Sequence, residues 1–186
     1  MKIILASNSP RRKQLFAGLD LPFEVRIIDG IDESYPKDLP AEQVAEAIAC
    51  SKASFYEPAN DEIILTADTT VVIGETVLGK PANRDEAVEM LRMLSGKTHR
   101  VITGVCLKSV CKQKNFSVVS EVTFKNLLDS EIFYYVDRYK PFDKAGAYGI
   151  QEWIGFIGVS KLNGSYFNVM GLPVQRIYEE LHATFI

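Results

Sequence analysis

The stretch "LASNSPRRKQLF", Leu5–Phe16, joins a short apolar strand to a helix through a serine-rich turn. The run "KIILA", residues 2–6, is typical of a buried strand. Ser9 is a good helix N-cap, and Pro10 fits the first turn of a helix that we expect to end near Gly18. A strand that leads through such a turn into a helix points backbone N–H groups at a bound anion. The stretch therefore predicts an α/β unit with an anion site.

Four basic side chains support this interpretation. Arg11 and Arg12 lie in the first turn of the helix, where cations are unfavourable against the helix dipole unless an anion is bound. Their guanidinium groups suit bidentate phosphate binding, and a solvated surface pair is the alternative for this stretch by itself. Lys52 interrupts a small, apolar helix face, and Lys80 lies between a strand end and a helix start. Together the four residues predict a site for a polyphosphate.

Two acidic residues have positions that suit a metal ion bound beside a phosphate chain. Asp68 follows the apolar run "EIILTA" directly, and we expect it at the carboxyl end of a strand, where α/β proteins tend to place their chemistry; an Asx turn or cap is the alternative. Glu33 lies in the acidic loop "DGIDESYP". Mg²⁺ prefers carboxylate oxygens together with substrate oxygens. We therefore expect a divalent metal at Glu33 and Asp68, and the sequence leaves open whether Asp68 is base, ligand or both.

The composition excludes several classes of protein. A chain of 186 residues with 47% hydrophobic and 24% charged residues is ordinary for one globular domain, which we expect over residues 1–186. A net charge of −3 disfavours a nucleic-acid-binding surface. There is no apolar run long enough to span a membrane and no export signal, so we expect a cytoplasmic protein. Three cysteines without a Cys-x-x-Cys pattern indicate reduced, structural thiols.

Other chemistries lack their motifs. No Walker loop or G-x-G-x-x-G follows the first strand, which disfavours a kinase or a dehydrogenase. His99 begins a strand and His182 ends the last helix, and we interpret both as structural. Ser7, Ser9 and Ser165 have no nucleophile elbow or base, so a covalent serine mechanism has no support.

Helices alternate with local hairpins and distant strands along the chain, which predicts an α/β fold with a mixed sheet. The expected strands cover residues 2–6, 23–28, 62–68, 70–80 with a hairpin at Gly74 and Glu75, 99–110 and 116–124. The expected helices cover 10–18, a segment from Pro40, a segment from a cap at Asn83 or Asp85 to Gly96, 129–139 with a cap at Asp129 or Ser130, and 173–182. We expect glycine-rich connections in the remainder of the last third.

Five motifs together resemble the Maf family of nucleotide pyrophosphatases. In chain order they are "LASNSPRRKQLF", "TADTTV", "GKPANRDEAVEMLRMLSGKTHRVITGV", "DKAGAYGIQ" and "NGSYFNVMGLP". The resemblance spans nearly the whole chain. It implies a fold like that of the inosine triphosphate pyrophosphatases, with a mixed, elongated β-sheet flanked by helices and two lobes around a cleft.

The resemblance also implies an activity and a set of site residues. The reaction is hydrolysis of a nucleoside triphosphate to the monophosphate and pyrophosphate with a divalent cation, Mg²⁺ or Mn²⁺. The residue matching the family's proton acceptor is Asp68. The residues matching the phosphate and metal site are Ser7, Arg12, Glu33, Lys52 and Lys80.

Three positions separate the branches of this family, and here they carry Arg11, Thr69 and Gln151. These residues resemble the dTTP/UTP branch, whereas the 7-methyl-GTP branch tends to carry tryptophan, glutamine and glutamate. The Gln151 amide offers a donor and an acceptor to the edge of a 4-keto pyrimidine. Departures from the family pattern are modest, at Asn8 and Thr70.

Alternatives remain at this point. A 7-methyl-GTP pyrophosphatase is disfavoured by Thr69 and Gln151, and a non-catalytic nucleotide-binding regulator of cell division has no need for Asp68. A modified pyrimidine nucleotide that keeps the same hydrogen-bonding edge of the ring is a further alternative substrate. The sequence leaves the oligomeric state open between a monomer and a homodimer, since members of the family that it resembles are often dimers. The aromatic "IFYYVDRY", residues 132–139, offers an interface, while an amphipathic core helix explains that segment at least as well.

Overall fold

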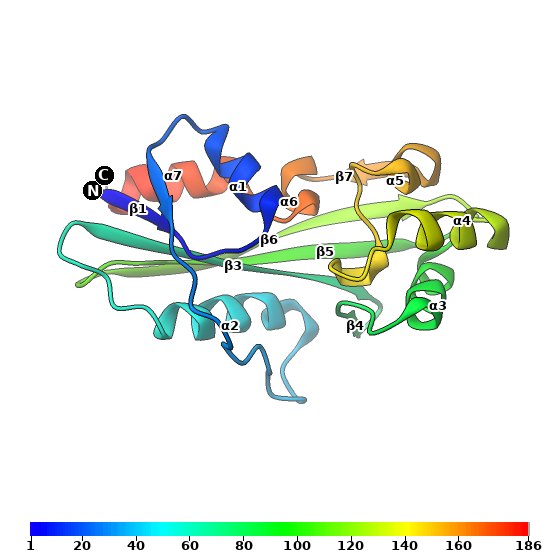
Figure 1. The fold of residues 1–186 in the computed structure, drawn as a ribbon, viewed down its shortest axis with the longest axis horizontal. Coiled ribbons are helices and arrows are strands. Elements are labelled where there is room, and N and C mark those ends of the chain that lie inside the picture. Colours follow the sequence, from blue (N-terminus) through cyan, green and yellow to red (C-terminus); the bar gives the residue numbers. More distant parts are fainter. Residues whose placement is uncertain (186) are drawn as a thin grey trace. The chain divides into compact units, whose positions relative to one another are not determined.

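The predicted mixed sheet is present in the computed structural model, which describes residues 1–185 (Figure 1). The opening strand β1 (Lys2–Leu5) pairs in parallel with both β2 (Phe23–Val25) and β3 (Glu62–Ile73). The seven strands follow the order β2-β1-β3-β5-β6-β7, with β4 paired to β3. The bounds of the remaining strands are Thr76–Leu78 for β4, Thr98–Lys108 for β5, Gln113–Phe124 for β6 and Val159–Asn163 for β7.

The chain divides into two compact units, each with its own apolar core. The first unit comprises residues 1–69, 103–118 and those from Gly171 onward, and the second comprises residues 70–102 and 119–170. Strands β3, β5 and β6 contribute residues to both units. A single domain over residues 1–186, and a cleft between two lobes, stay predictions.

Helices cover both faces of the strands in the first unit. Figure 1 shows α1 (Pro10–Ala17) and α7 (Val174–Thr184) on one face and α2 (Ala41–Ser54) on the other. Side chains alternate accordingly along each strand, because successive residues point to opposite faces. Core residues on the α1 and α7 side include Ile3, Leu5, Phe16, Leu65 and Leu181, and those on the other side include Ile4, Ile64, Ala49, Ala53 and Cys106.

Local signals at the start of the chain behave as expected. The Ser9 side chain caps α1 by accepting a hydrogen bond from the backbone N–H of Arg12, and Gly18 is the C-cap. Glycine is required at Gly104 on β5 because a Cβ there would lie 2.2 Å from the backbone nitrogen of Glu46. Because of this close approach, α2 packs directly against β5. This packing fixes the position of the polar side chains at the end of α2.

The second unit holds a separate core under α3 (Arg84–Leu94) and α4 (Asp129–Tyr139). The expected Asn83 cap of α3 is confirmed, since its side chain accepts from the backbone N–H of Glu86. The expected cap of α4 was wrong, because the helix already begins at Asp129 and its N-cap is Leu128. The Glu131 carboxylate accepts from the Leu128 N–H and replaces a side-chain cap.

Two further differences concern the strands and the last third of the chain. Asp68 lies inside β3, and the expectation that a strand ends there was wrong. The β-branched run after it continues the strand, and residues 71–73 pair with β4. The connections of the last third contain a short 3₁₀ helix η1 (Ala145–Ala147), α5 (Trp153–Gly158) and α6 (Tyr166–Met170), besides β7. Within residues 1–185, none of the helices has the length and apolar character that a bilayer crossing requires.

Candidate active site

The ammonium group of Lys52 holds two carboxylates in the first unit. Lys52 Nζ lies 2.7 Å from Oδ1 of Asp68 and 2.8 Å from Oε1 of Glu33. Lys52 comes from the last turn of α2, Asp68 from β3, and Glu33 from the loop that follows β2. The side chains of Lys52 and Asp68 are each only 13% exposed, so their charges are largely withdrawn from water and depend on each other. The structure therefore brings together three of the predicted site residues.

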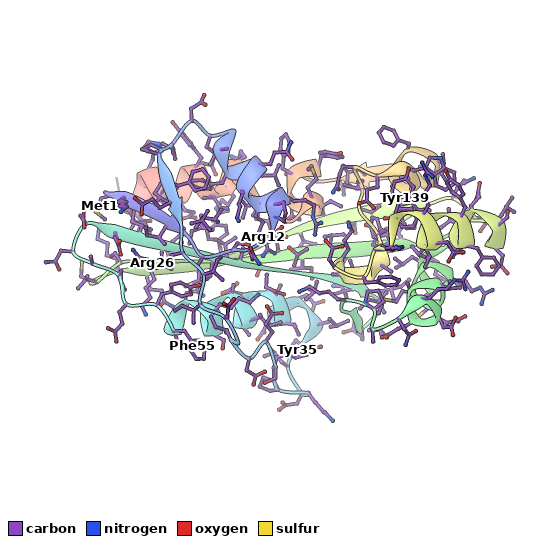
Figure 2. All side chains as sticks on the ribbon, viewed as in Figure 1. Met1, Arg12, Arg26, Tyr35, Phe55 and Tyr139 are labelled. Carbon is purple, nitrogen blue, oxygen red and sulfur yellow. The ribbon has the colours of Figure 1, made fainter. Side chains whose placement is uncertain are left out.

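Arg12, labelled in Figure 2, lies on α1, and its guanidinium group contacts Ala67 and Thr69 of β3. Its Nε donates to the Gly171 carbonyl at 2.8 Å, Nη1 to the Ala67 carbonyl at 2.8 Å and Nη2 to Thr69 Oγ1 at 3.1 Å. Burial lowers the pKa of Arg12, although the charges of Asp68 and Glu33 act in the opposite direction. Arg12 thus ties three chain segments together by a fixed fork of donors.

The Thr69 hydroxyl lies at the centre of a small polar cluster, where it accepts from Arg12 and donates to the Gly171 carbonyl. Its Oγ1 lies 2.9 Å from Oγ1 of Thr103 on β5 and 3.5 Å from the Gly171 carbonyl. Thr103 is fully buried. The sequence reasoning missed Thr103 and Gly171; the available signals were a lone polar residue within the apolar run "VITGVCL" and a glycine in a matched motif. Gly171 has a φ of +115°, a conformation that other residues rarely adopt.

The turn before α1 contains a hydrogen bond between two of its own serines. Ser7 is buried, and its Oγ accepts a hydrogen bond from the Ser9 N–H at 3.3 Å. Arg11 follows on the helix, and its charge lowers the pKa of the neighbouring Arg12 by repulsion. The first unit therefore carries seven of the predicted site residues, which we call the charged site: Ser7, Arg11, Arg12, Glu33, Lys52, Asp68 and Thr69.

Lys80 and Gln151 belong to the second unit. Lys80 is exposed in the connection between β4 and α3. Gln151 is half-buried in the turn between η1 and α5. Its Oε1 atom is buried and has no hydrogen-bond partner among the described residues. An association of these two side chains with the charged site stays a prediction.

Glu33 and Asp68 are the candidate metal ligands. Among residues 1–185, no group of three or more His, Cys, Asp or Glu side chains is arranged to hold a metal ion. Mg²⁺ commonly uses only one or two carboxylates, with substrate phosphates and water as its other ligands. Two carboxylates joined by one ammonium group fit such an ion and do not fit an all-protein cage.

Comparisons with known proteins give related sequences and a related fold. A family model described as "Maf-like protein" matches residues 2–184. A dTTP/UTP pyrophosphatase of Phocaeicola vulgatus is 61% identical over 182 residues, covering 97% of this chain and 94% of the relative. A dTTP/UTP pyrophosphatase of Parabacteroides distasonis is 58% identical with the same coverage. A solved HAM1 protein from Coxiella burnetii has a TM-score of 0.52 at 14% identity, covering 99% of this chain and all of that chain, so the likeness concerns the fold.

Proposed function

The chain belongs to the Maf family, and on this premise we propose that it hydrolyses dTTP and UTP to the nucleoside monophosphate and pyrophosphate. The relatives from Phocaeicola vulgatus and Parabacteroides distasonis, both called dTTP/UTP pyrophosphatase, are 61% and 58% identical to it, and the matched region covers 94% of each relative. The observation that carries the proposal is the pairing of Lys52 with Asp68 and Glu33, since it joins a candidate base to a candidate phosphate-binding cation. Modified pyrimidine nucleotides are included in the proposed substrate class.

Asp68 is the proposed general base. Its Oδ1 is held by Lys52 through a charge-assisted hydrogen bond, which fixes the orientation of the carboxylate. The Oδ2 atom is then available to take the proton of the attacking water. Because the carboxylate is only 13% exposed, few competing waters surround it.

The basic residues are proposed to hold the triphosphate. An arginine side chain has five N–H donors, and Arg12 uses three on the protein, so the other two suffice for one bidentate phosphate contact. Lys52, Lys80 and Ser7 complete the proposed phosphate site. Their positive charges and donors stabilise the charge that develops on the pyrophosphate leaving group.

Glu33 and Asp68 are proposed to hold the divalent cation. When bound, Mg²⁺ or Mn²⁺ supplies charge neutralisation and polarisation of the phosphate oxygens. Lys52, which touches both carboxylates, keeps them side by side before the cation and the substrate arrive.

Gln151, Thr69 and Arg11 are proposed to determine which nucleotide base is accepted. Uracil and thymine present an acceptor, a ring N–H and another acceptor, and the unpartnered Oε1 of Gln151 suits that N–H. A base that leaves this buried acceptor unpaired loses about 1–3 kcal/mol. Uracil and thymine differ by one methyl group, worth roughly 1 kcal/mol, so both are accepted.

The proposal is tested by pyrophosphate release from purified protein with dTTP, UTP, CTP, GTP and 7-methyl-GTP, each with Mg²⁺ and with a chelator. We expect rapid release from dTTP and UTP in the presence of Mg²⁺ only. Preference for 7-methyl-GTP would place the chain in the other branch. Nucleotide binding without pyrophosphate release from any member of the panel would indicate the non-catalytic regulator.

A further inference from the structure

A polar network begins at Tyr135 in the apolar core of the second unit and extends through the partly exposed side chain of Glu152 to Lys144. The Tyr135 hydroxyl on α4 donates to Oε2 of Glu152, and it accepts a hydrogen bond from the Gly149 N–H at 3.1 Å. The other carboxylate oxygen of Glu152 lies 3.2 Å from Lys144 Nζ. A continuous chain of bonds thus runs from the Gly149 backbone through a tyrosine and a carboxylate to an ammonium group.

This network is not needed to fill the core. Tyr135 is fully buried between apolar neighbours, and its ring stacks on Tyr139 with centroids 5.1 Å apart, an arrangement that phenylalanine would reproduce. The pKa of Tyr135 is raised, mainly by burial and also by its bond to Glu152. Replacing buried polar pairs by apolar groups is often neutral or stabilising, so packing and stability give no reason for these polar groups. Their effect is to fix one geometry.

The geometry that they fix is that of the turn carrying Gln151. The Glu152 N–H donates to the Gly149 carbonyl at 3.0 Å, which closes a tight turn around Ile150 and Gln151. Tyr135 holds both ends of this turn, the first through the Gly149 N–H and the second through the Glu152 carboxylate.

The interior of the turn is packed closely around the same side chains. A Cβ added at Gly149 would lie 3.1 Å from both Glu152 Cδ and Lys144 Cε, and 3.3 Å from Gln151 Nε2. The side chains of Glu152 and Lys144 and the amide of Gln151 therefore all border the space beside Gly149, and Gln151 Oε1 is buried without a hydrogen-bond partner among the described residues.

We infer that Tyr135, Glu152 and Lys144 are positioning residues that hold the Gln151 amide in the orientation that reads the pyrimidine ring edge. The inference rests on the proposed function and extends it to residues that make no proposed contact with substrate. An amide turned over presents a donor where an acceptor is needed, so selectivity depends on its orientation. Holding a flexible glutamine in place before binding also reduces the entropy lost on binding.

Discrimination between UTP and CTP measures this orientation, because cytosine has an acceptor at N3 and a donor at the 4-position, where uracil has a donor and an acceptor. We compare kcat/KM for the two nucleotides in the wild type and in Tyr135→Phe, which removes one hydroxyl and keeps the ring. The expected result is an about tenfold lower UTP/CTP ratio, expressed mainly as a higher KM for UTP. Tyr134→Phe is the matched control, since it removes the hydroxyl of the adjacent, exposed tyrosine and is expected to leave the ratio unchanged.

A role confined to folding would lower kcat/KM for both nucleotides by a common factor, and an unchanged ratio in Tyr135→Phe would overturn the inference. Glu152→Gln keeps an acceptor for Tyr135 and removes one of the two carboxylates near Lys144. The Lys144 Nζ also lies 2.7 Å from Oδ1 of Asp143, so a smaller shift in the same direction is expected. This variant decides the question if Tyr135→Phe does not fold, as judged by thermal unfolding.

A double-mutant cycle identifies the residue through which the network acts. In a Gln151→Ala background, Tyr135→Phe is expected to change the ratio no further, and a shift that persists there would overturn the assignment to Gln151. Failure of the wild type to hydrolyse UTP or dTTP would instead overturn the proposed function. The two failures are therefore distinguishable in one set of measurements.

Discussion

Lys52 Nζ lies 2.7 Å from Asp68 Oδ1, and this bond joins the end of α2 to the middle of β3. Both side chains are mostly buried, and the Lys52 ammonium also contacts Glu33. A cation and a candidate base are thus brought together by one helix that packs on one strand, and the loop after β2 adds Glu33, a candidate metal ligand. Removal of Lys52 takes this ion pair away from the largely desolvated Asp68 carboxylate, whereas Lys52 keeps Glu33 as a partner when Asp68 is replaced.

Asp68→Asn is expected to lower kcat by about a hundredfold or more, because an amide cannot accept the proton of the attacking water. The fold is expected to persist, since Lys52 keeps Glu33 as a partner at 2.8 Å. Pyrophosphate release and thermal unfolding measure the two effects. Asp61→Asn, at an exposed position just before β3, is the control and should keep full turnover. Wild-type turnover in Asp68→Asn would remove this residue from the mechanism.

Gln151→Glu is expected to lower kcat/KM for UTP and dTTP by about tenfold or more. The change replaces an amide with an acceptor-only carboxylate, so the donor for a pyrimidine keto group is lost. Steady-state kinetics on both substrates measure the loss, with the concentration of folded protein checked for each variant. Unchanged kinetics for both nucleotides would show that Gln151 does not read the base.

Arg12→Lys is expected to destabilise the protein by about 2 kcal/mol. An ammonium group cannot reach the Gly171 carbonyl, the Ala67 carbonyl and Thr69 Oγ1 at once, and each unmade bond leaves a poorly solvated acceptor. Urea unfolding measures the free energy, and Lys13→Arg on the same helix is the control for exchanging these residue types. If the free energies of unfolding of Arg12→Lys and the wild type agree, the three bonds contribute nothing to stability.

Stability is expected to fall as the pH drops from about 6.5 to 4 because of His99. The imidazole is 1% exposed, its Nε2 lies 2.7 Å from the Tyr148 hydroxyl, and burial lowers its pKa from 6.5 to about 4. The unfolded chain therefore binds the proton more tightly than the folded chain. The contribution of neutral His99 to the free energy of unfolding is fully present above the unfolded pKa, and it falls by about 3 kcal/mol as the pH drops through this window.

Urea unfolding at a series of pH values measures this slope, and His99→Phe should flatten it. Arg26 lowers the pKa of Glu62 to about 2, so the titration of that carboxylate lies below most of the window. An equal slope in the wild type and in His99→Phe would assign the pH dependence to other groups.

Local signals in the sequence determined the elements that surround the charged site. Ser9 and Gly18 mark the two ends of α1, and the turn residues Gly74 and Glu75 predict the hairpin between β3 and β4. Both features depend on residues only a few positions apart. The order of the motifs was sufficient to identify the Maf family. Strand ends and the short elements of the last third were not predictable, since pairing with neighbouring strands decides where β3 stops.

The tertiary structure alone decided what each site residue contacts. The sequence indicated that Arg12, Lys52 and Asp68 serve one site, but Arg12 binds carbonyls 55 and 159 residues away, and Lys52 pairs with Asp68 across 16 residues. The contacts of Thr103 with Thr69 and of Tyr135 with Glu152 were found only in the structure. Hydrogen bonds and ion pairs act over a few ångströms, and such distances between remote residues are set by the packing of helices on strands, which no local pattern encodes.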